Sequence, residues 1–406
     1  MKRKRLPYAR QTITEADIDT VVSVLRGDWL TQGPEVERFE AALCTATGGR
    51  HAVVVSNGTS ALHLAGIGLG IGRETVGITS AITFAASANG MAHAGADVHF
   101  VDVDPRSGLM DLDALEICID DLIRQKRRPA LIVPVHLAGT AVDMVRVAEI
   151  AKRCGAKVLE DAAHAIGATY RAANQVFRIG ECAHSDATVF SFHPVKHVTS
   201  GEGGAVVTND DALADTLRLL RTHGITRETR WLERDAEDPF FGPWYYEQVA
   251  LGFNYRLSDI QAALGRSQLT RLETSVRRRR EIARQYDMLL TGKALARVLR
   301  PLKPGKGTSS FHLYVVQVHV AGASAIEVAE LRRDLFLFLR KKGVFTQVHY
   351  VPVPWLPYYA RMETKAYPGA EAYYAASLSL PMFPSMIDDD VMYVANALTE
   401  WAAERP

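Results

Sequence analysis

The feature that most constrains the fold is an alternation of short apolar runs with helical patterns between about residues 50 and 210. The runs expected to be strands are HAVVVS, TVGITS, VHFVDVD, LIVPVH, KVLEDAAH, ATVFSFH and GAVVTND. Several are apolar on both faces and rich in Val and Ile, which is typical of strands in a mostly parallel sheet covered on both sides. The alternation therefore predicts an α/β fold with its functional site at the carboxyl ends of the strands.

After Arg256 the pattern changes, and the rest of the chain predicts a second, smaller domain. The stretch 257–286 is expected to be one long helix, with Ser258 as its N-cap. We divide the chain into a large α/β domain with an N-terminal segment, residues 1–265, and a linking helix with a smaller α+β domain, residues 266–406.

Two runs in the final third, HLYVVQVHV and VFTQVHYVPV, predict strands of the smaller domain. His349 and Tyr350 belong to the second run, where packing is the expected role of both side chains and proximity to the substrate is the alternative. The insert at 227–248 is polar, aromatic and contains Pro and Gly, so a packed surface loop is expected there.

Composition and charge exclude several classes of function. The 406 residues carry a net charge of +1, whereas binding to a nucleic-acid backbone needs a clear positive surplus. The leading MKRKR is not followed by an apolar stretch, which argues against a signal peptide or a membrane anchor. The cysteines lack the paired spacing of disulfide or zinc sites, so we expect reduced thiols, no metal and a cytoplasmic location. They are Cys44, Cys118, Cys154 and Cys182.

Three polar groups follow predicted strands of this sheet. Lys196 lies in FSFHPVKHVTSGEGG, Asp161 closes the run KVLED, and His164 comes three residues later. Taken alone, the lysine is explained as a solvated charge and the acid as a helix N-cap. Because strands of one sheet end at the same crevice, we expect the lysine and the acid to face each other there.

A third element, SNGTSAL, ends a strand at Ser56 and opens a helix with Gly58 and Thr59. Free amides and hydroxyls at a helix start bind phosphate. A lysine, an acid and a phosphate cradle around one crevice are what pyridoxal 5′-phosphate requires, because the amine binds its aldehyde and the acid keeps the pyridine nitrogen protonated. His164 can lie against one face of the ring, and Phe84 is a candidate to cover the other.

Several motifs together resemble the sugar-nucleotide aminotransferases of the DegT/StrS type. These motifs are LTQGPEVERFE, SNGTSALHLA, EDAAHAIGA, FSFHPVKHVTSGEGGAVVTND, GFNYRLSDIQAALG and FTQVHYVPV, and the similarity covers nearly the whole chain from Tyr8 onward. The resemblance implies a fold type I, aspartate-aminotransferase-like protein with a mostly parallel seven-stranded sheet. It also implies a homodimer with active sites at the subunit interface.

The resemblance also assigns roles to individual residues. Lys196 matches the Schiff-base lysine, Asp161 the partner of the pyridine nitrogen, and His164 the ring-stacking residue. The matches to phosphate-binding positions are Gly58, Thr59, Ser191 and, from the neighbouring subunit, Asn254. The matches to sugar-nucleotide contacts are Tyr8, Asp28, Trp29, Leu30, Thr31, His312, Leu313, Tyr314 and Val315.

The implied reaction transfers an amino group from L-glutamate to C4 of a UDP-4-keto-6-deoxy-N-acetylhexosamine, as in pseudaminic acid synthesis. Some relatives carry histidine in place of the lysine and catalyse dehydration, so Lys196 favours transamination. Two alternatives remain open. One is an aminotransferase for another sugar carbon or another nucleotide, and the other is a protein that binds pyridoxal phosphate for regulation without turnover.

Overall fold

The computed structural model describes residues 5–233, 242–303, 305–362 and 365–403. Its centre is a seven-stranded sheet in the order β1-β9-β8-β5-β4-β2-β3. The strands are β1 (His51–Val55), β2 (Val76–Ser80), β3 (Asp97–Val101), β4 (Pro129–Val133), β5 (Lys157–Asp161), β8 (Ala187–Ser191) and β9 (Gly204–Thr208). Only β9 runs against its neighbours, so the prediction of an α/β fold with a mostly parallel sheet is confirmed.

Helices cover both faces of this sheet, which explains why its strands are apolar on both sides. One face packs against α3 (Gly58–Gly68), α4 (Ala86–His93) and α7 (Asp211–Arg221). The opposite face packs against α2 (Pro34–Thr47), α5 (Leu112–Arg124), α6 (Met144–Cys154) and α8 (Asp259–Leu269). In β1, for example, Val53 contacts the first layer and Val54 the second.

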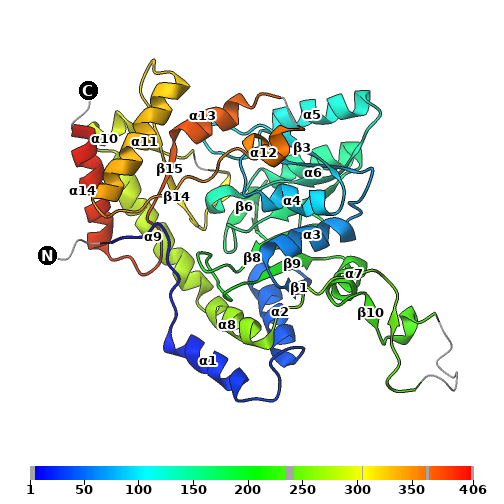
Figure 1. Cartoon of the computed structure of the whole chain (residues 1–406). Coiled ribbons are helices and arrows are strands. Elements are labelled where there is room, and N and C mark those ends of the chain that lie inside the picture. The colour runs from blue at the N-terminus through cyan, green and yellow to red at the C-terminus, as the bar shows by residue number, and fades with distance from the viewer. Residues whose placement is uncertain (1–4, 234–241, 304, 363–364, 404–406) are drawn as a thin grey trace.

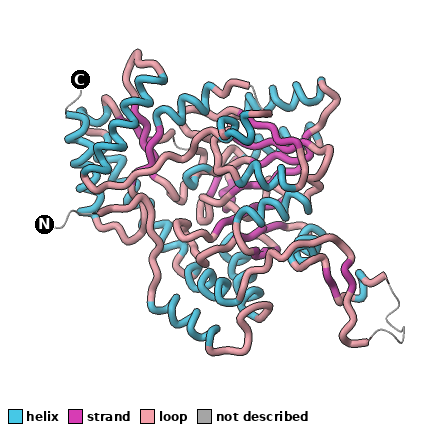
Figure 2. Tube along the Cα trace, viewed as in Figure 1, coloured by secondary structure: helices cyan, strands magenta, loops and turns pink. Residues whose placement is uncertain are grey.

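A smaller domain surrounds a three-stranded antiparallel sheet and lies to one side of the large sheet (Figures 1 and 2). Its strands are β12 (Leu299–Pro301), β14 (Tyr314–Val318) and β15 (Ser377–Leu380). Its helices are α9 (Leu272–Leu290), α10 (Lys293–Ala296), α11 (Ala325–Lys341), α13 (Pro368–Ala376) and α14 (Asp388–Ala403). Leu6 joins this core from the N-terminal segment, through a bridge to Val344.

Other helices and strands pack around these two domains. They are α1 (Glu15–Leu25), the sheet of β6 (Thr169–Ala172), β7 (Gln175–Arg178) and β13 (Gly307–Thr308), α12 (Pro357–Ala360), and the pair β10 (Ile225–Thr226) and β11 (Glu247–Gln248). The β10–β11 pair and the described parts of the 227–248 insert extend away from the sheet (Figure 1). The middle of that insert, residues 234–241, lies outside the described residues, and Trp244 on its return is exposed.

The prediction of one long helix at 257–286 is wrong, because the chain forms two helices there, α8 and α9. Ser258 caps α8 as predicted, through a hydrogen bond from the Gln261 amide. The helix then tightens, since the amides of Thr270 and Arg271 bond to carbonyls three residues back. Hydrophobic contacts pass from the large core to the small core within α9, whereas the proposed division at residue 265 falls inside α8.

The run VFTQVHYVPV does not form the predicted strand. It makes isolated bridges at Val344 and Gln347 and ends in a short 3₁₀ turn at Val353–Trp355. Pro352 and Pro354 lack the amide hydrogens that a continued strand would donate to a neighbour. The segment therefore leaves the small sheet and extends toward the crevice between the two domains.

Candidate active site

A cavity of about 720 Å³, called here the lysine cavity, lies at the carboxyl ends of the central strands. Asp161 ends β5 and Ser191 ends β8 at its wall, as the topology of parallel strands requires. Predicted site residues that line it are Tyr8, Gly58, Thr59, Phe84, Asp161, His164, Ser191 and Lys196. The structure thus brings most of the predicted cofactor site together.

Lys196 is held by a compact turn between β8 and β9. Its amide donates to the His193 carbonyl at 2.9 Å, while Phe192 bonds to Gly203 at 2.8 Å and closes the base of the loop. Burial lowers the pKa of the Lys196 amine to about 8, against the opposing pull of the Asp161 carboxylate. About a tenth of this amine is therefore neutral, and nucleophilic, at pH 7, far more than for a solvated lysine.

Asp161 is almost fully buried, and two donors orient its carboxylate. Ser87 on α4 donates its hydroxyl to Oδ2 at 2.6 Å, and the Ala163 amide donates to Oδ1 at 3.1 Å. The Thr83 hydroxyl lies 2.6 Å from that of Ser87 and extends the network. A fixed, acceptor-only carboxylate in this position can pair with a protonated ring nitrogen.

His164 is a neutral, oriented ring. Burial, followed by the positive charges of Lys196 and nearby histidines, holds its pKa well below the ordinary value. The Ala138 amide donates to Nδ1 at 3.4 Å, so the proton resides on Nε2 and is donated to the Tyr350 hydroxyl at 3.1 Å. Behind it, the His312 ring lies 4.3 Å away, centroid to centroid.

The start of α3, where the sequence predicts a phosphate cradle, lies at the wall of the lysine cavity. Asn57 caps the helix by accepting the Ser60 amide at 2.8 Å, which leaves earlier amides free for a ligand. Gly58 packs closely on the end of β8, because a Cβ atom there would lie 3.0 Å from the Cβ of Ser191. The contact between the start of β9 and Asn57 is closer still, because a Cβ atom on Gly204 would lie 2.5 Å from the Asn57 carbonyl oxygen.

Several residues of the lysine cavity were not assigned to it from the sequence. His349 and Tyr350 line the cavity instead of only packing, and the Tyr350 ring lies 5.9 Å from that of Phe84. Ser87 had no role in the sequence interpretation, although it donates a hydrogen bond directly to the Asp161 carboxylate. For His349 and Tyr350, the sequence did contain a warning against a strand: the prolines in YVPVP are incompatible with a central strand.

Other predicted residues do not line the lysine cavity. The 28–31 segment is exposed and is attached to the start of α8 by a bridge between Thr31 and Ser258. Residues 312–315 are buried: the His312 ring is tilted by 36° against that of His164, and Tyr314 donates its hydroxyl to Asp287 inside the small domain. Asn254 is exposed, whereas its neighbour Tyr255 reaches the cavity.

The residues present fit pyridoxal phosphate. A buried amine with a pKa of about 8, an oriented carboxylate and a glycine-lined helix start face one cavity. Within the described part of the chain, no group of three His, Cys, Asp or Glu side chains could hold a metal ion. No helix of those same residues combines the length and apolar character that crossing a bilayer requires.

Fold and site together define an aminotransferase of the pyridoxal-phosphate-dependent class. Residues 11–399 match the DegT/DnrJ/EryC1/StrS aminotransferase family, and the chain belongs to that family. It is 36% identical to the spore coat polysaccharide biosynthesis protein SpsC of Bacillus subtilis, over 97% of this chain and 96% of the relative. The same identity and coverage relate it to a Campylobacter jejuni UDP-4-amino-4,6-dideoxy-N-acetyl-β-L-altrosamine transaminase.

Solved structures agree with this placement. Helicobacter pylori PseC, an aminotransferase of pseudaminic acid biosynthesis, superimposes with a TM-score of 0.86 at 30% identity, covering 99% of this chain and 100% of the other. A putative sugar aminotransferase of Streptococcus pneumoniae in its PLP form has a TM-score of 0.84 at 29% identity and 99% coverage of both chains. The predicted family and cofactor are thereby confirmed, and the protein is a sugar aminotransferase.

Proposed function

We propose that this chain transfers an amino group from L-glutamate to C4 of a UDP-4-keto-6-deoxy-N-acetylhexosamine. The observation that carries the proposal is that Lys196, with its pKa lowered to about 8, and Asp161 line one cavity of about 720 Å³. The family match supports the chemistry, and the names of the Campylobacter and Helicobacter relatives support this substrate and the pseudaminic acid pathway.

Bound pyridoxal phosphate supplies an electron sink for cleavage of the C–H bond next to the transferred nitrogen. In our proposal Gly58, Thr59 and Ser191 hold its phosphate and Asp161 holds its ring nitrogen. The amine of Lys196 would hold the cofactor by its aldehyde between turnovers. As a free amine, its Nζ would accept a proton from the donor carbon that carries the nitrogen and, in the second half of the reaction, would donate a proton to C4 of the keto sugar.

His164 and Tyr350 orient and enclose the ring in this proposal. Because His164 is neutral, it adds no positive charge beside the protonated ring nitrogen and does not compete for Asp161. Phe84 and Tyr350 both line the cavity, with ring centroids 5.9 Å apart, and in this proposal they would help to shield the reacting carbon from water. Hydrogen bonds to hydroxyl and acetamido groups would then distinguish one sugar from another.

A second candidate differs only in the sugar. The Bacillus relative is a spore coat polysaccharide biosynthesis protein, and its identity to this chain is the same 36% as that of the Campylobacter transaminase. Another keto-sugar nucleotide is therefore the alternative substrate, with transfer at C4 or C3.

A panel of keto-sugar nucleotides, each incubated with glutamate and analysed by mass spectrometry, tests both candidates. We expect the amino sugar from UDP-4-keto-6-deoxy-N-acetylhexosamine to form fastest, and no product with Lys196→Ala. Faster turnover of a 3-keto or a GDP-linked sugar would replace the first candidate with the second. If glutamate leaves the cofactor absorbance of the wild type unchanged, a transaminase function is excluded.

A further inference from the structure

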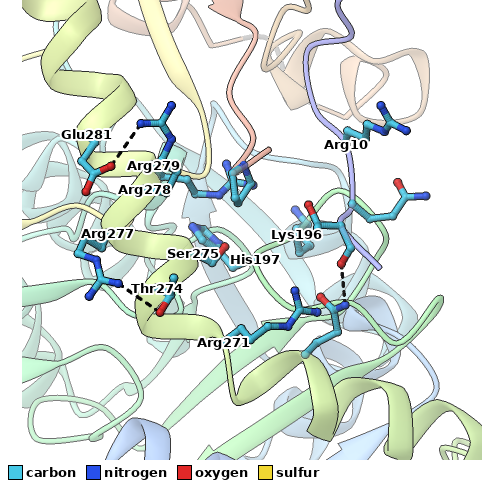
Figure 3. A pocket seen from close by; sticks show the side chains of 14 residues that line it. Arg10, Lys196, His197, Arg271, Thr274, Ser275, Arg277, Arg278, Arg279 and Glu281 are labelled. Atoms are coloured by element: carbon cyan, nitrogen blue, oxygen red, sulfur yellow. Dashed lines mark hydrogen bonds and ion pairs between the residues drawn. The ribbon is translucent and has the colours of Figure 1, made fainter. Parts of the chain in front are cut away.

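Lys196 also lines a second cavity, of about 390 Å³, which is separate from the lysine cavity and is called here the arginine cavity. Its wall combines the N-terminal segment 10–12, the end of α8, the first half of α9 and Pro384. Figure 3 shows its basic side chains arranged around it, with Arg10 and α9 on opposite sides. The arginines that line it are Arg10, Arg271, Arg277, Arg278 and Arg279.

Two of these arginines are neutralised by carboxylates. Arg271 pairs with the buried Asp17 at 2.5 Å, and Arg278 pairs with Asp388 at 2.8 Å and Glu281 at 3.3 Å. Glu281 is the only acidic side chain among the described residues that line the cavity. These ion pairs fix the guanidinium groups of Arg271 and Arg278 in place. The other three arginines therefore determine the net charge of the cavity.

The other three arginines have no carboxylate partner within the described residues. Arg277 donates to the Thr274 hydroxyl at 3.4 Å, and Arg10 has no hydrogen-bond or ion-pair partner there. Arg279 is fully buried, donates to three main-chain carbonyls, and has a pKa lowered by burial to about 10, so it stays charged at neutral pH. The cavity therefore has a surplus of positive charge in a chain whose net charge is only +1.

Three buried polar atoms of the lining lack hydrogen-bond partners: Thr12 Oγ1, His197 Nδ1 and Arg279 Nε. His197 is only 6% exposed, and its Nε2 donates to the Ser310 carbonyl at 3.0 Å. Because burial also holds the pKa of His197 well below its ordinary value, the ring is neutral and Nδ1 is an acceptor. The lining thus offers charged donors together with one buried acceptor, and unpaired buried groups of this kind call for a partner.

We propose that the arginine cavity binds a phosphate-bearing ligand, with its anionic oxygens on Arg10, Arg277 and Arg279 and a ligand hydroxyl on His197 Nδ1. Guanidinium groups match phosphate oxygens in pairs and bind them through short charge-assisted hydrogen bonds. A hydroxyl of a phosphate ester, or of a protonated phosphate, supplies the proton that His197 accepts. A plain carboxylate would satisfy the arginines and leave this acceptor unpaired.

Two sources provide this chemistry. Because Lys196 lines both cavities, the diphosphate of the sugar-nucleotide substrate is one source, and this part rests on the function proposed above. The other source is a free phosphate compound bound apart from the substrate. Competition between pyrophosphate and the keto-sugar nucleotide distinguishes them, because only the first source makes the two mutually exclusive.

Calorimetric titration of the full-length, cofactor-loaded protein with inorganic pyrophosphate tests the proposal. Arg10→Ala combined with Arg277→Ala removes two uncommitted cations, and both are exposed side chains whose loss leaves the core intact. Losing hydrogen bonds to a charged ligand should weaken binding by roughly tenfold or more. The matched control combines Arg26→Ala with Arg284→Ala, two exposed arginines outside the cavity, and should keep wild-type affinity.

The outcomes are distinct. Weaker binding in the double variant together with a raised KM for the keto-sugar nucleotide, and competition by pyrophosphate, assigns the cavity to the substrate's diphosphate. Weaker binding with unchanged KM assigns it to a separate phosphate compound. No pyrophosphate binding by the wild type, or an equal loss in the control pair, overturns the proposal. Since binding is measured without turnover, inactivity toward every keto sugar would refute the proposed function alone.

Discussion

Lys196 has an environment that favours its neutral form, and this has a measurable consequence for cofactor attachment. Below the pKa of about 8, each pH unit lowers the neutral fraction about tenfold. We expect the rate of covalent attachment of pyridoxal phosphate to the apoprotein to rise with pH up to about 8 and then level off. Borohydride trapping followed by mass spectrometry of the Lys196 peptide measures this rate. An inflection near pH 10 would mean that the amine is solvated.

The same shift affects stability. In the unfolded chain the Lys196 pKa returns to 10.5, so between about pH 8 and 10.5 the unfolded state binds more protons than the folded apoprotein. Stability contributed by this site therefore rises with pH across that window. Relative to Lys196→Met, wild-type apoprotein should be destabilised by up to about 3 kcal/mol at pH 7, with the difference vanishing above pH 10.5. Urea unfolding at several pH values gives both curves, and a pH-independent difference would contradict the assignment.

Ser87 acts through Asp161 and is a positioning residue. Its hydroxyl is 2.6 Å from Oδ2, and losing a hydrogen bond to a charged group costs about 1.5–3 kcal/mol. We expect Ser87→Ala to lower kcat by roughly tenfold to a hundredfold with little change in KM for the sugar, and Ser87→Thr to restore most of it. A variant that loses stability but keeps its kcat would show that Ser87 only supports the fold.

At the scale of elements, the sequence was most informative where one local signal was sufficient. The central strands were predictable because their two apolar faces reflect burial under helices on both sides. Ser258 was predictable because capping depends on residues within one turn. The break at Thr270 and the irregular path of 344–353 were not, since both depend on contacts with distant parts of the chain.

The close contact between β9 and the start of α3 is another such tertiary feature. A Cβ on Gly204 would lie 2.5 Å from the Asn57 carbonyl oxygen and 2.8 Å from the Gly58 nitrogen. Gly204→Ala should therefore displace the phosphate cradle, destabilise the protein by about 1–3 kcal/mol and weaken pyridoxal phosphate binding. Denaturant unfolding and cofactor titration measure the two effects. Gly72→Ala is the control, because a Cβ there meets nothing within 4 Å, and equal effects in both variants would contradict this account.

At the scale of the whole molecule, the lysine cavity is assembled from both domains. The large sheet supplies Lys196 and Asp161, whereas Tyr350 comes from the segment that leaves the small sheet. The common location of Lys196 and Asp161 was predictable from the sequence, because the carboxyl ends of parallel strands lie at the same edge of a sheet. The sequence could not locate Tyr350, because the position of that side chain depends on how the two domains pack against each other.

Two predicted parts of the site lie on the surface of the single chain: residues 28–31 and Asn254. The 28–31 segment includes Trp29, which is 59% exposed, and Leu251 near Asn254 is 87% exposed. A surface that another protein covers would present large apolar side chains of this kind beside both parts. This supports the prediction of a dimer in which Asn254 serves the site of the neighbouring subunit.

Mixed dimers decide whether Asn254 acts across an interface. Lys196→Ala and Asn254→Ala should each be nearly inactive alone. If the two residues of one site come from different subunits, a heterodimer of these variants has one intact site, because its Lys196 and its Asn254 are both wild type. Equal mixing after dissociation should then restore about a quarter of wild-type activity, since half of the dimers are mixed and each has one working site. If Asn254 serves its own subunit, no mixture contains an intact site and activity stays at the level of the parents. Sedimentation of the mixture verifies that dimers have re-formed, and a fully active monomer would rule out the shared site altogether.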